Sequence, residues 1–149
     1  MIELRPAHMT DLLAIEGLLD EFNLVFEGVD ENISDFFVLS MNQNIIGCIG
    51  LEVFNTVALL RSFAVRSRHQ KQGYGLLLLR KIETAASCRG IHQLFLLTNT
   101  ARGFFDKYGY AVANRSDAPK AIASTREFSE LCPESSTFMQ KEIRVKKNE

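Results

Sequence analysis

Apolar and polar residues alternate along the chain with two different periods. Between residues 10 and 22 the apolar side chains recur every three or four positions, which predicts an amphipathic helix. Thr10 and Asp11 are residue types that can cap the start of this helix. An apolar stretch at residues 2–5 predicts a short strand before it, and residues 25–34 predict a loop or short helix after it.

Three consecutive strands are predicted next. Residues 36–41 and 45–54 are rich in apolar, β-branched and aromatic side chains, and the turn-forming Asn42-Gln43-Asn44 separates them. Asn55-Thr56 then leads into a third such run at residues 57–65. Because short turns join antiparallel neighbours, these three strands are expected to form a meander.

The rest of the chain predicts helices and strands in alternation: a helix at 74–87, a strand at 93–98, a helix at 100–107, and strands at 110–114 and 137–144. Gly90 and Gly109 follow the two helices, where glycine readily adopts the left-handed conformation that ends a helix. The run at 93–98 is so apolar that a central, buried strand is expected. An irregular segment with Pro119 and Pro133 comes before the last strand.

Length and composition favour one compact enzyme domain. With 149 residues, 46% of them hydrophobic, the chain can bury a core but is short for two ordinary domains. We therefore expect one domain over residues 1–144 and a solvated tail at 145–149. A run of about 18 apolar residues and an apolar leader are both absent from the sequence, which predicts a cytoplasmic protein without a membrane partner.

Metal and nucleic-acid binding are not expected. Cys48, Cys88 and Cys132 lie far apart and the three histidines are equally scattered, so neither a disulfide framework nor a metal site is predicted. A formal net charge of -1 gives no general attraction for a polyanion. The basic residues gather in one loop instead of along a face.

That loop, residues 66–75, has the composition of a phosphate-binding site. Gly73 and Gly75 let a phosphate approach backbone N–H groups closely at the start of the following helix. Three cations lie within the loop: Arg66, Arg68 and Lys71. The spacing fits neither a Rossmann fingerprint, since position 78 is leucine, nor a P-loop. A ligand with a pyrophosphate is predicted, and a solvated basic turn is the alternative.

Two motifs resemble those of a known family. Gln70-x-x-Gly73-x-Gly75 resembles the Q/R-x-x-G-x-G/A signature of the GNAT acetyltransferases, and Ala101-x-x-Phe104-Phe105-x-x-x-Gly109-Tyr110 resembles their A-x-x-F/L-Y-x-x-x-G-F/Y motif. The predicted order of elements also resembles that of the GNAT fold. The resemblance implies an α/β (α+β) fold, with a mixed, mostly antiparallel sheet, a central splay and helices on both faces.

Further segments resemble the arsenic-resistance N-acetyltransferase branch of this superfamily. They are Gly50–Val53, Leu59–Ser62, Leu96–Thr98, Thr125–Phe128 and Leu131–Pro133. The resemblance implies acetyl-CoA-dependent acetylation of the amino group of a small molecule, either an amino acid or a toxic arsenical or phosphinic analogue. It also suggests a homodimer, which is common among similar enzymes.

The resemblance implies where acetyl-CoA binds. GNAT enzymes splay two strands apart, here assigned to residues 45–54 and 57–65, and the thioester lies in the gap. The implied cofactor-binding residues are Phe63, Ala64 and Val65 for the pantetheine, Gln70, Lys71, Gln72, Gly73, Tyr74 and Gly75 for the pyrophosphate, and Thr98 and Phe105 from the second half of the chain. An N–H near Val65 would polarise the thioester carbonyl.

Glu52 is the candidate base that takes a proton from the substrate ammonium. It is an isolated carboxylate in an apolar strand, on the same face as Gly50 and Phe54. Its position resembles that of the base in many GNAT enzymes. Two structural alternatives remain open, namely a surface glutamate or an ion-pair partner for Arg61 across the hairpin.

For the general acid and the substrate ligands, the sequence leaves more than one interpretation open. Many GNAT enzymes protonate the leaving thiolate with a tyrosine at the position of Phe105, which cannot donate a proton. Tyr108 or water is the substitute, and a packing role for Tyr108 is the alternative. Arg61 and Arg126 are candidates for binding an acidic group of the substrate, with a structural ion pair or a solvated side chain as the alternative for each.

Two other functions remain open. A noncatalytic coenzyme A binding or regulatory module could keep the phosphate loop after losing the general acid, and Phe105 is the feature that favours it. Acetylation of a protein or peptide amine is the other, because similar enzymes also modify N-termini and lysines.

Overall fold

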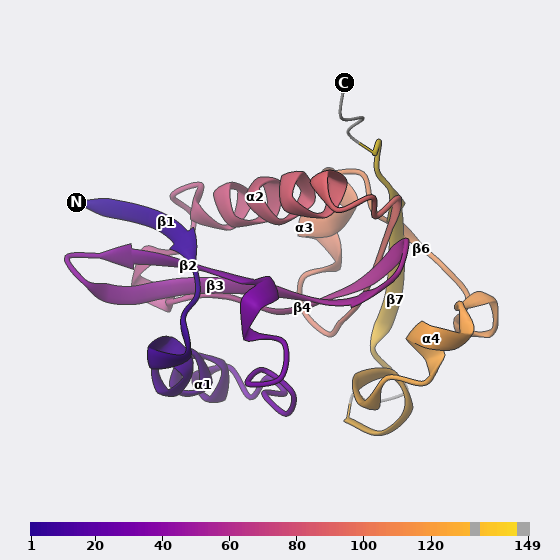
Figure 1. Cartoon of the computed structure of the whole chain (residues 1–149), viewed down its shortest axis with the longest axis horizontal. Coiled ribbons are helices and arrows are strands. Elements are labelled where there is room, and N and C mark those ends of the chain that lie inside the picture. Colours follow the sequence, from indigo (N-terminus) through magenta and orange to yellow (C-terminus); the bar gives the residue numbers. More distant parts are fainter. Residues whose placement is uncertain (132–134, 146–149) are drawn as a thin grey trace. The chain divides into compact units, whose positions relative to one another are not determined.

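The computed structural model describes residues 1–131 and 135–145 (Figure 1). Its strands are β1 (Ile2–Pro6), β2 (Phe36–Met41), β3 (Asn44–Phe54), β4 (Val57–Val65), β5 (Gln93–Thr98), β6 (Ala111–Val112) and β7 (Thr137–Glu142). Its α-helices are α1 (Leu12–Glu21), α2 (Tyr74–Cys88), α3 (Arg102–Lys107) and α4 (Lys120–Ala123). Short helical turns are η1 (Met9–Asp11), η2 (Ile33–Asp35), η3 (Ser67–His69), η4 (Arg115–Asp117) and the π-helical η5 (Glu127–Leu131).

The strands form a mixed sheet in the order β1-β2-β3-β4-β5-β7-β6. The pairing is antiparallel in β1–β2, β2–β3, β5–β7 and β6–β7, and parallel in β4–β5. Within the described ranges, none of the helices combines the length and the apolar character needed to cross a membrane.

The chain divides into two compact units, Met1–Glu52 with Leu60–Ala85, and Val53–Leu59 with Ala86–Glu149. The assignment of residues 1–144 to one domain stays a prediction. The last four residues of the predicted tail and Pro133 of the predicted irregular segment lie outside the described residues.

In the first unit, α1 and α2 cover opposite faces of the strands (Figure 1). The helical periodicity of α1 brings Ile15, Leu18 and Leu19 to one side, where they are fully buried against β2 and β3 residues such as Val38 and Cys48. This core holds the strands on which the predicted cofactor loop and Glu52 are carried.

The β2–β3 hairpin follows the turn chemistry of its sequence. Asn42 and Gln43 both have positive φ, 51° and 71°, as the two central residues of a type I′ turn require. A two-residue turn of this kind matches the twist of the flanking strands. The predicted hairpin is confirmed, and β3 begins one residue earlier than expected, at Asn44.

Gly50 in β3 lies directly against an aromatic ring. Its partner across the β2–β3 ladder is Phe36, whose side chain is fully buried. A Cβ built on Gly50 would overlap the Phe36 ring. Glycine is therefore required here for packing, because its missing side chain leaves the space that the ring fills.

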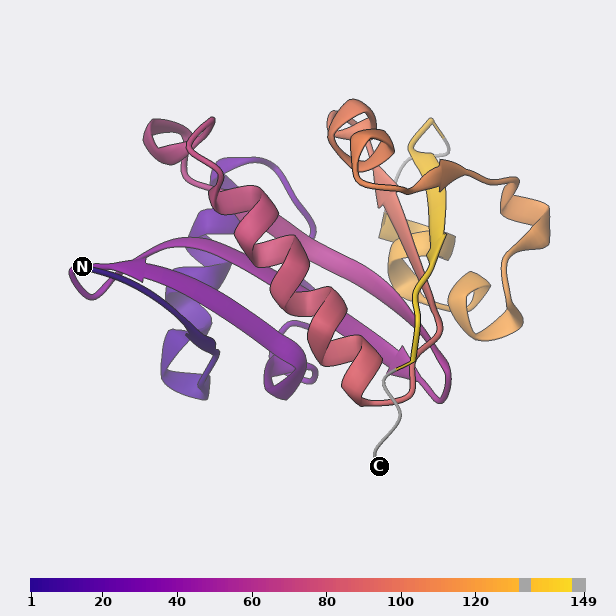
Figure 2. The same cartoon turned by 90° about the horizontal axis from the view of Figure 1, so that it is seen from above.

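The second unit is built on β5 and β7. All six residues of β5 pair with β7, from Gln93 opposite Glu142 to Thr98 opposite Thr137. The rings of Phe95 and Phe138 stack with centroids 5.6 Å apart, and Ile122 of α4 is buried in the same cluster. Figure 2 shows β5 and β7 side by side. The buried strand predicted at 93–98 is confirmed.

Several predicted boundaries need correction. The strand predicted at 110–114 is reduced to Ala111–Val112, and the last strand ends at Glu142. The helix predicted at 100–107 begins at Arg102. Inside the segment predicted as irregular, the chain forms η4, α4 and η5.

The predicted gap between residues 45–54 and 57–65 is wrong. β3 and β4 are hydrogen-bonded neighbours, and the Arg66 N–H just beyond β4 donates to the Ile46 carbonyl at 2.7 Å. The physical reason is the short Asn55-Thr56 turn, which closes the two strands into a hairpin. The parallel ladder of β4 with β5 instead covers Val57–Leu59 and Gln93–Phe95.

Asp11 does not cap α1 as predicted. It is the last residue of η1 and has helical dihedral angles, whereas a capping residue is usually extended. Its carboxylate accepts hydrogen bonds from the His8 N–H at 2.7 Å and from two Arg5 nitrogens at 2.8 and 2.9 Å. The hydrogen bond from Arg5 is the main cause that lowers the pKa of Asp11.

Asp11→Asn is expected to lower the free energy of unfolding by about 1–2 kcal/mol at pH 7, since it removes a charge-assisted pair. Because the folded pKa of Asp11 is lowered, the stabilisation is present above the unfolded pKa of about 3.9 and is lost as the pH falls through the folded value. Urea unfolding at pH 7 and pH 3 should therefore show a larger difference from wild type at pH 7 than at pH 3. Asp20→Asn on the exposed side of α1 is the control, and an equal loss at both pH values would contradict the ion-pair explanation.

Candidate functional site

β4 contains a residue in the left-handed region. Ser62 has φ 57°, although it is not glycine and lies inside the strand. The alternation of burial is lost around it, because four successive residues from Ala58 to Arg61 are buried and the next two, Ser62 and Phe63, are half-buried. Such a conformation is typical of a β-bulge, which redirects the strand and often lies near a functional site. It comes immediately before the predicted pantetheine-binding residues.

Two side chains hold Ser62 in this conformation. The Cys48 thiol donates to the Ser62 carbonyl oxygen at 3.1 Å, and Arg61 Nε donates to Ser62 Oγ at 2.9 Å. Burial raises the pKa of Cys48 to about 12, which a hydrogen bond from the Ala64 backbone partly opposes. The sulfur therefore keeps its proton at neutral pH and can act as a donor.

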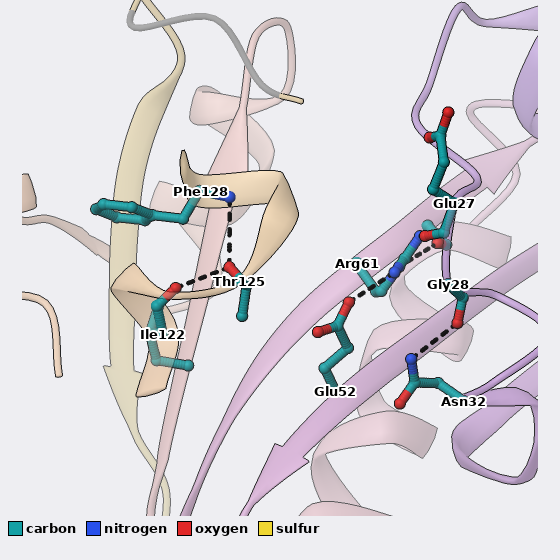
Figure 3. A network of polar contacts seen from close by, with 9 residues as sticks. Glu27, Gly28, Asn32, Glu52, Arg61, Ile122, Thr125 and Phe128 are labelled. Atoms are coloured by element: carbon teal, nitrogen blue, oxygen red, sulfur yellow. Dashed lines mark hydrogen bonds and ion pairs between the residues drawn. The ribbon is translucent and has the colours of Figure 1, made fainter. Parts of the chain in front are cut away.

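Arg61 connects three parts of the first unit (Figure 3). Besides its bond to Ser62, its Nη1 donates to Glu52 Oε1 at 2.6 Å and its Nη2 to the Glu27 carbonyl oxygen at 2.6 Å. The Arg61 side chain is 4% exposed and the Glu52 side chain 15%. The ion pair that the sequence left open for Glu52 is therefore present.

The loop that Arg61 contacts lies close to both charged side chains. Gly28 has φ 86°, and a Cβ built there would lie 3.0 Å from Arg61 Nη1 and 4.0 Å from Glu52 Oε1. Asn32 Nδ2 donates to the Gly28 carbonyl at 2.8 Å, as Figure 3 shows. The backbone at Gly28 thus lies close to the Arg61 guanidinium and the Glu52 carboxylate.

The predicted phosphate loop is fixed at its start. Gln70 Nε2 donates to the carbonyl oxygen of Val65, the last residue of β4, at 2.8 Å. This bond gives the glutamine of the motif a physical role, because it ties the loop back to the strand it leaves. The loop itself contains the turn η3 and then runs into α2.

Gly73 has the geometry that a close approach of phosphate needs. Its φ is 88°, and a Cβ built on it meets no atom within 4 Å, so the space beside its backbone is open. Lys71 also has positive φ, at 64°. The first N–H groups of α2 have no acceptor within the helix and carry its positive dipole end. Gln72, Tyr74 and Gly75 complete this segment, which can hold a pyrophosphate.

The cationic side chains of the loop lie in different surroundings. Arg66 donates to Glu21 and to the Ile45 carbonyl, both at 3.2 Å. Arg66, Arg68 and His69 line a pocket of about 780 Å³ in the first unit, together with residues 41–46 of the hairpin. Lys71 is exposed and lies two positions before Gly73 of the motif.

The predicted residues of the second unit have their own contacts. Thr98 Oγ1 accepts a hydrogen bond from the Ala101 N–H at 3.0 Å, just before α3. Phe105 is 3% exposed and packs edge-to-face on Tyr110. Tyr108 is half-buried and packs on Phe104, with ring centroids 5.0 Å apart. Arg126 is exposed in the segment between α4 and η5.

Three features of the site are missing from the sequence-based prediction. They are the left-handed Ser62, the contact of Arg61 with the Glu27 carbonyl, and the donor role of Cys48. Serine in an apolar strand gives no sign of a positive φ, and a backbone acceptor 34 residues away has no signature in residue type. Among the described residues, no group of three or more His, Cys, Asp or Glu could hold a metal ion.

Comparisons with known proteins agree with this geometry. Residues 32–112, more than half of the chain, match the model of a family described as an acetyltransferase (GNAT) domain. An uncharacterized N-acetyltransferase of Chlorobaculum tepidum is 34% identical over 118 residues, which are 78% of this chain and 74% of the relative. An amino-acid acetyltransferase of Neisseria meningitidis is 29% identical over 128 residues, which are 80% of this chain.

A solved structure has the same fold. The N-acetylglutamate synthase of Neisseria gonorrhoeae, complexed with coenzyme A and N-acetyl-glutamate, matches 97% of this chain with a TM-score of 0.83 and 25% identity. The chain spans only 29% of the length of the meningococcal enzyme and 35% of the gonococcal one. The predicted fold class is confirmed.

Proposed function

This chain belongs to the GNAT acetyltransferase family, and on that premise we propose that it moves the acetyl group of acetyl-CoA to the amino group of an amino acid or a related small molecule. The observation that carries the proposal is the pairing of two features in the first unit. Gly73 leaves open backbone at the start of α2, and Glu52 lies on β3 in an ion pair that fixes its position.

On the cofactor side, the segment from Gln70 to Gly75 binds the pyrophosphate through backbone N–H groups and the N-terminal end of α2. The bond between Gln70 and Val65 supports this role, because it sets the distance between the loop and the end of β4. Phe63, Ala64 and Val65 offer main-chain groups to the pantetheine just after Ser62. An N–H in this stretch polarises the thioester carbonyl.

In the reaction, the acceptor nitrogen attacks the thioester carbon, a C–N bond forms and the C–S bond breaks. Glu52 takes the proton that the ammonium must lose, directly or through water. The coenzyme leaves as a thiolate, which water or Tyr108 protonates. Because a thiol with a pKa of about 8.5 is a tolerable leaving group, Phe105 in place of a tyrosine does not prevent turnover.

The choice of acceptor rests on the relatives. Proteins named amino-acid acetyltransferase and N-acetylglutamate synthase are among those similar to this chain, which favours an amino acid. Arg126 is a candidate ligand for an acidic group on it, whereas such a role for Arg61 competes with the bonds described above. An arsenical or phosphinic analogue, a protein or peptide amine, a cytoplasmic location and a homodimer all stay predictions.

The alternative function is a noncatalytic module that binds coenzyme A. Phe105 is the specific feature that favours it, because the tyrosine expected there is missing. Turnover separates the two, since a module of this kind binds acetyl-CoA without releasing free coenzyme A.

The test is a panel of amino acids and other small amines incubated with acetyl-CoA, with free thiol and N-acetylated product both measured. We expect acetylated product from at least one amino acid. Cys88 is exposed and would react with a thiol reagent, so a Cys88→Ser protein serves as the background control. Micromolar binding of acetyl-CoA without product from any amine would support the noncatalytic alternative.

Glu52→Gln tests the proposed base. The variant is expected to slow acetylation about 10²-fold near pH 6.5, because most of the acceptor is then protonated and needs a base. As the pH rises toward and past the pKa of the acceptor amine, more of the acceptor is already neutral, so the rate should approach that of wild type. Initial rates from pH 6 to 9.5, with acetyl-CoA affinity as the control, check this; a rate ratio that does not change with pH would remove Glu52 from the role.

A further inference from the structure

We propose that Arg61 is a positioning residue, whose single guanidinium holds the loop of residues 27–32 and the Glu52 carboxylate in a fixed relation to the left-handed Ser62. This deepens the proposed function and rests on it, because Glu52 is its proposed base. It assigns Arg61 a different task from the substrate ligand predicted from the sequence.

The first argument is the distribution of the guanidinium donors. Nε bonds to Ser62 Oγ, Nη1 to Glu52 Oε1 and Nη2 to the Glu27 carbonyl, at 2.9, 2.6 and 2.6 Å. The group is planar and its donors point in fixed directions. Three acceptors on a loop and two strands therefore cannot shift independently while these bonds are made.

The second argument is burial. With 4% of the side chain exposed, the Arg61 charge depends on protein partners for its solvation. A substrate carboxylate that bound the guanidinium through both oxygens would have to displace Glu52 or the Glu27 carbonyl. Displacement of Glu52 would also move the proposed base, so direct substrate binding at Arg61 would disturb the chemistry.

The third argument is the shape of the loop. Gly28 lets the backbone approach Arg61 and Glu52, since even a Cβ there would lie 3.0 Å from Nη1. Asn32 closes the loop on itself through the Gly28 carbonyl. The loop thus approaches Glu52 through the backbone at Gly28, and Arg61 joins it to β4 through the Glu27 carbonyl.

The experiment compares Arg61→Lys with Arg5→Lys. Lysine keeps the positive charge but cannot make three divergent bonds. Arg5 is the matched control, because it also bonds a carboxylate and a backbone carbonyl, those of Asp11 and Pro6, away from β4. Amide hydrogen exchange in the free proteins should speed up at least tenfold in residues 27–32 of Arg61→Lys and stay unchanged there in Arg5→Lys.

The second measurement uses the best amino-acid acceptor and its α-carboxamide. For Arg61→Lys we expect kcat/KM to fall at least tenfold by the same factor with both acceptors, while the Kd for acetyl-CoA changes less than threefold. Gly28→Ala, which keeps both charges but pushes the loop away, should give the same pattern and replaces Arg61→Lys if that variant does not fold. A loss confined to the carboxylate acceptor, or unchanged exchange in residues 27–32, would overturn the proposal.

The two proposals fail in different ways. If the wild-type protein acetylates no amine, the proposed function fails, whereas the hydrogen exchange of the loop still tests the positioning role of Arg61. If wild type turns over and the loop exchange is unchanged in Arg61→Lys, only the positioning role is lost.

Discussion

Gly73→Val is expected to weaken acetyl-CoA binding by more than tenfold. The valine branches would occupy the open space beside the backbone, where the pyrophosphate is proposed to approach. They would also strain the loop, because φ at this position is 88° and β-branched residues rarely adopt positive φ. A charge-assisted hydrogen bond is worth about 1.5–3 kcal/mol, so the loss of one bond alone accounts for tenfold or more. Isothermal titration with acetyl-CoA measures the effect.

The chain offers a closely matched control at Gly90. This glycine, just after α2, has φ 80°, and a Cβ built on it likewise meets nothing within 4 Å, but it is far along the chain from the motif. Gly73→Val and Gly90→Val should therefore lose a similar amount of folding stability, about 1–2 kcal/mol. Only the first should lose affinity. Normal affinity in Gly73→Val, or an equal loss in both proteins, would contradict the assignment of the loop.

Gly50→Val is expected to lower the free energy of unfolding by about 3 kcal/mol. The new side chain would overlap the fully buried Phe36 ring, and overpacking of this kind costs about 1–3 kcal/mol or occasionally more. That is a large share of the total stability of a typical domain. Urea unfolding measures it, and Gly17→Val on α1 is the control, because a Cβ there meets nothing within 4 Å.

A double mutant identifies the cause of the Gly50 effect. Phe36→Ala alone should cost about 3–5 kcal/mol by leaving a cavity. In Gly50→Val with Phe36→Ala, the valine fills part of that cavity, so the combined loss should be smaller than the sum of the two single losses. Strict additivity would show that the ring is not what excludes a side chain from position 50.

The predictable parts of the fold are those that depend on local chemistry. The periodicity of α1 and α2, the apolar run of β5 and the Asn-rich turn of the β2–β3 hairpin all follow from neighbouring residues, and each is confirmed. Gly73 has a positive φ, which glycine adopts readily, while its role in binding a phosphate stays a prediction. These features are local because a helix face or a turn is determined within a few residues.

What could not be predicted depends on contacts between distant segments. The short β6 and the course of residues 115–131 are determined by tertiary packing, and propensity says little about them. The place of the strand gap was wrong, although the short turn at Asn55-Thr56 already favoured a closed hairpin. For Glu52 the sequence left a base and an ion-pair partner open, and the 2.6 Å contact with Arg61 shows the pair, while the role of base stays a proposal.

The burial of Cys48 affects how readily oxidants react with this protein. Peroxides and disulfides react with a thiolate, and burial raises the pKa of the Cys48 thiol to about 12, so the thiolate is rare at pH 7. The sulfur that supports Ser62 is therefore a poor target for oxidants, whereas the exposed Cys88 is accessible to them. Of these two cysteines, the one that shapes β4 is protected by its burial, and Cys88 at the end of α2 is the more open to oxidation.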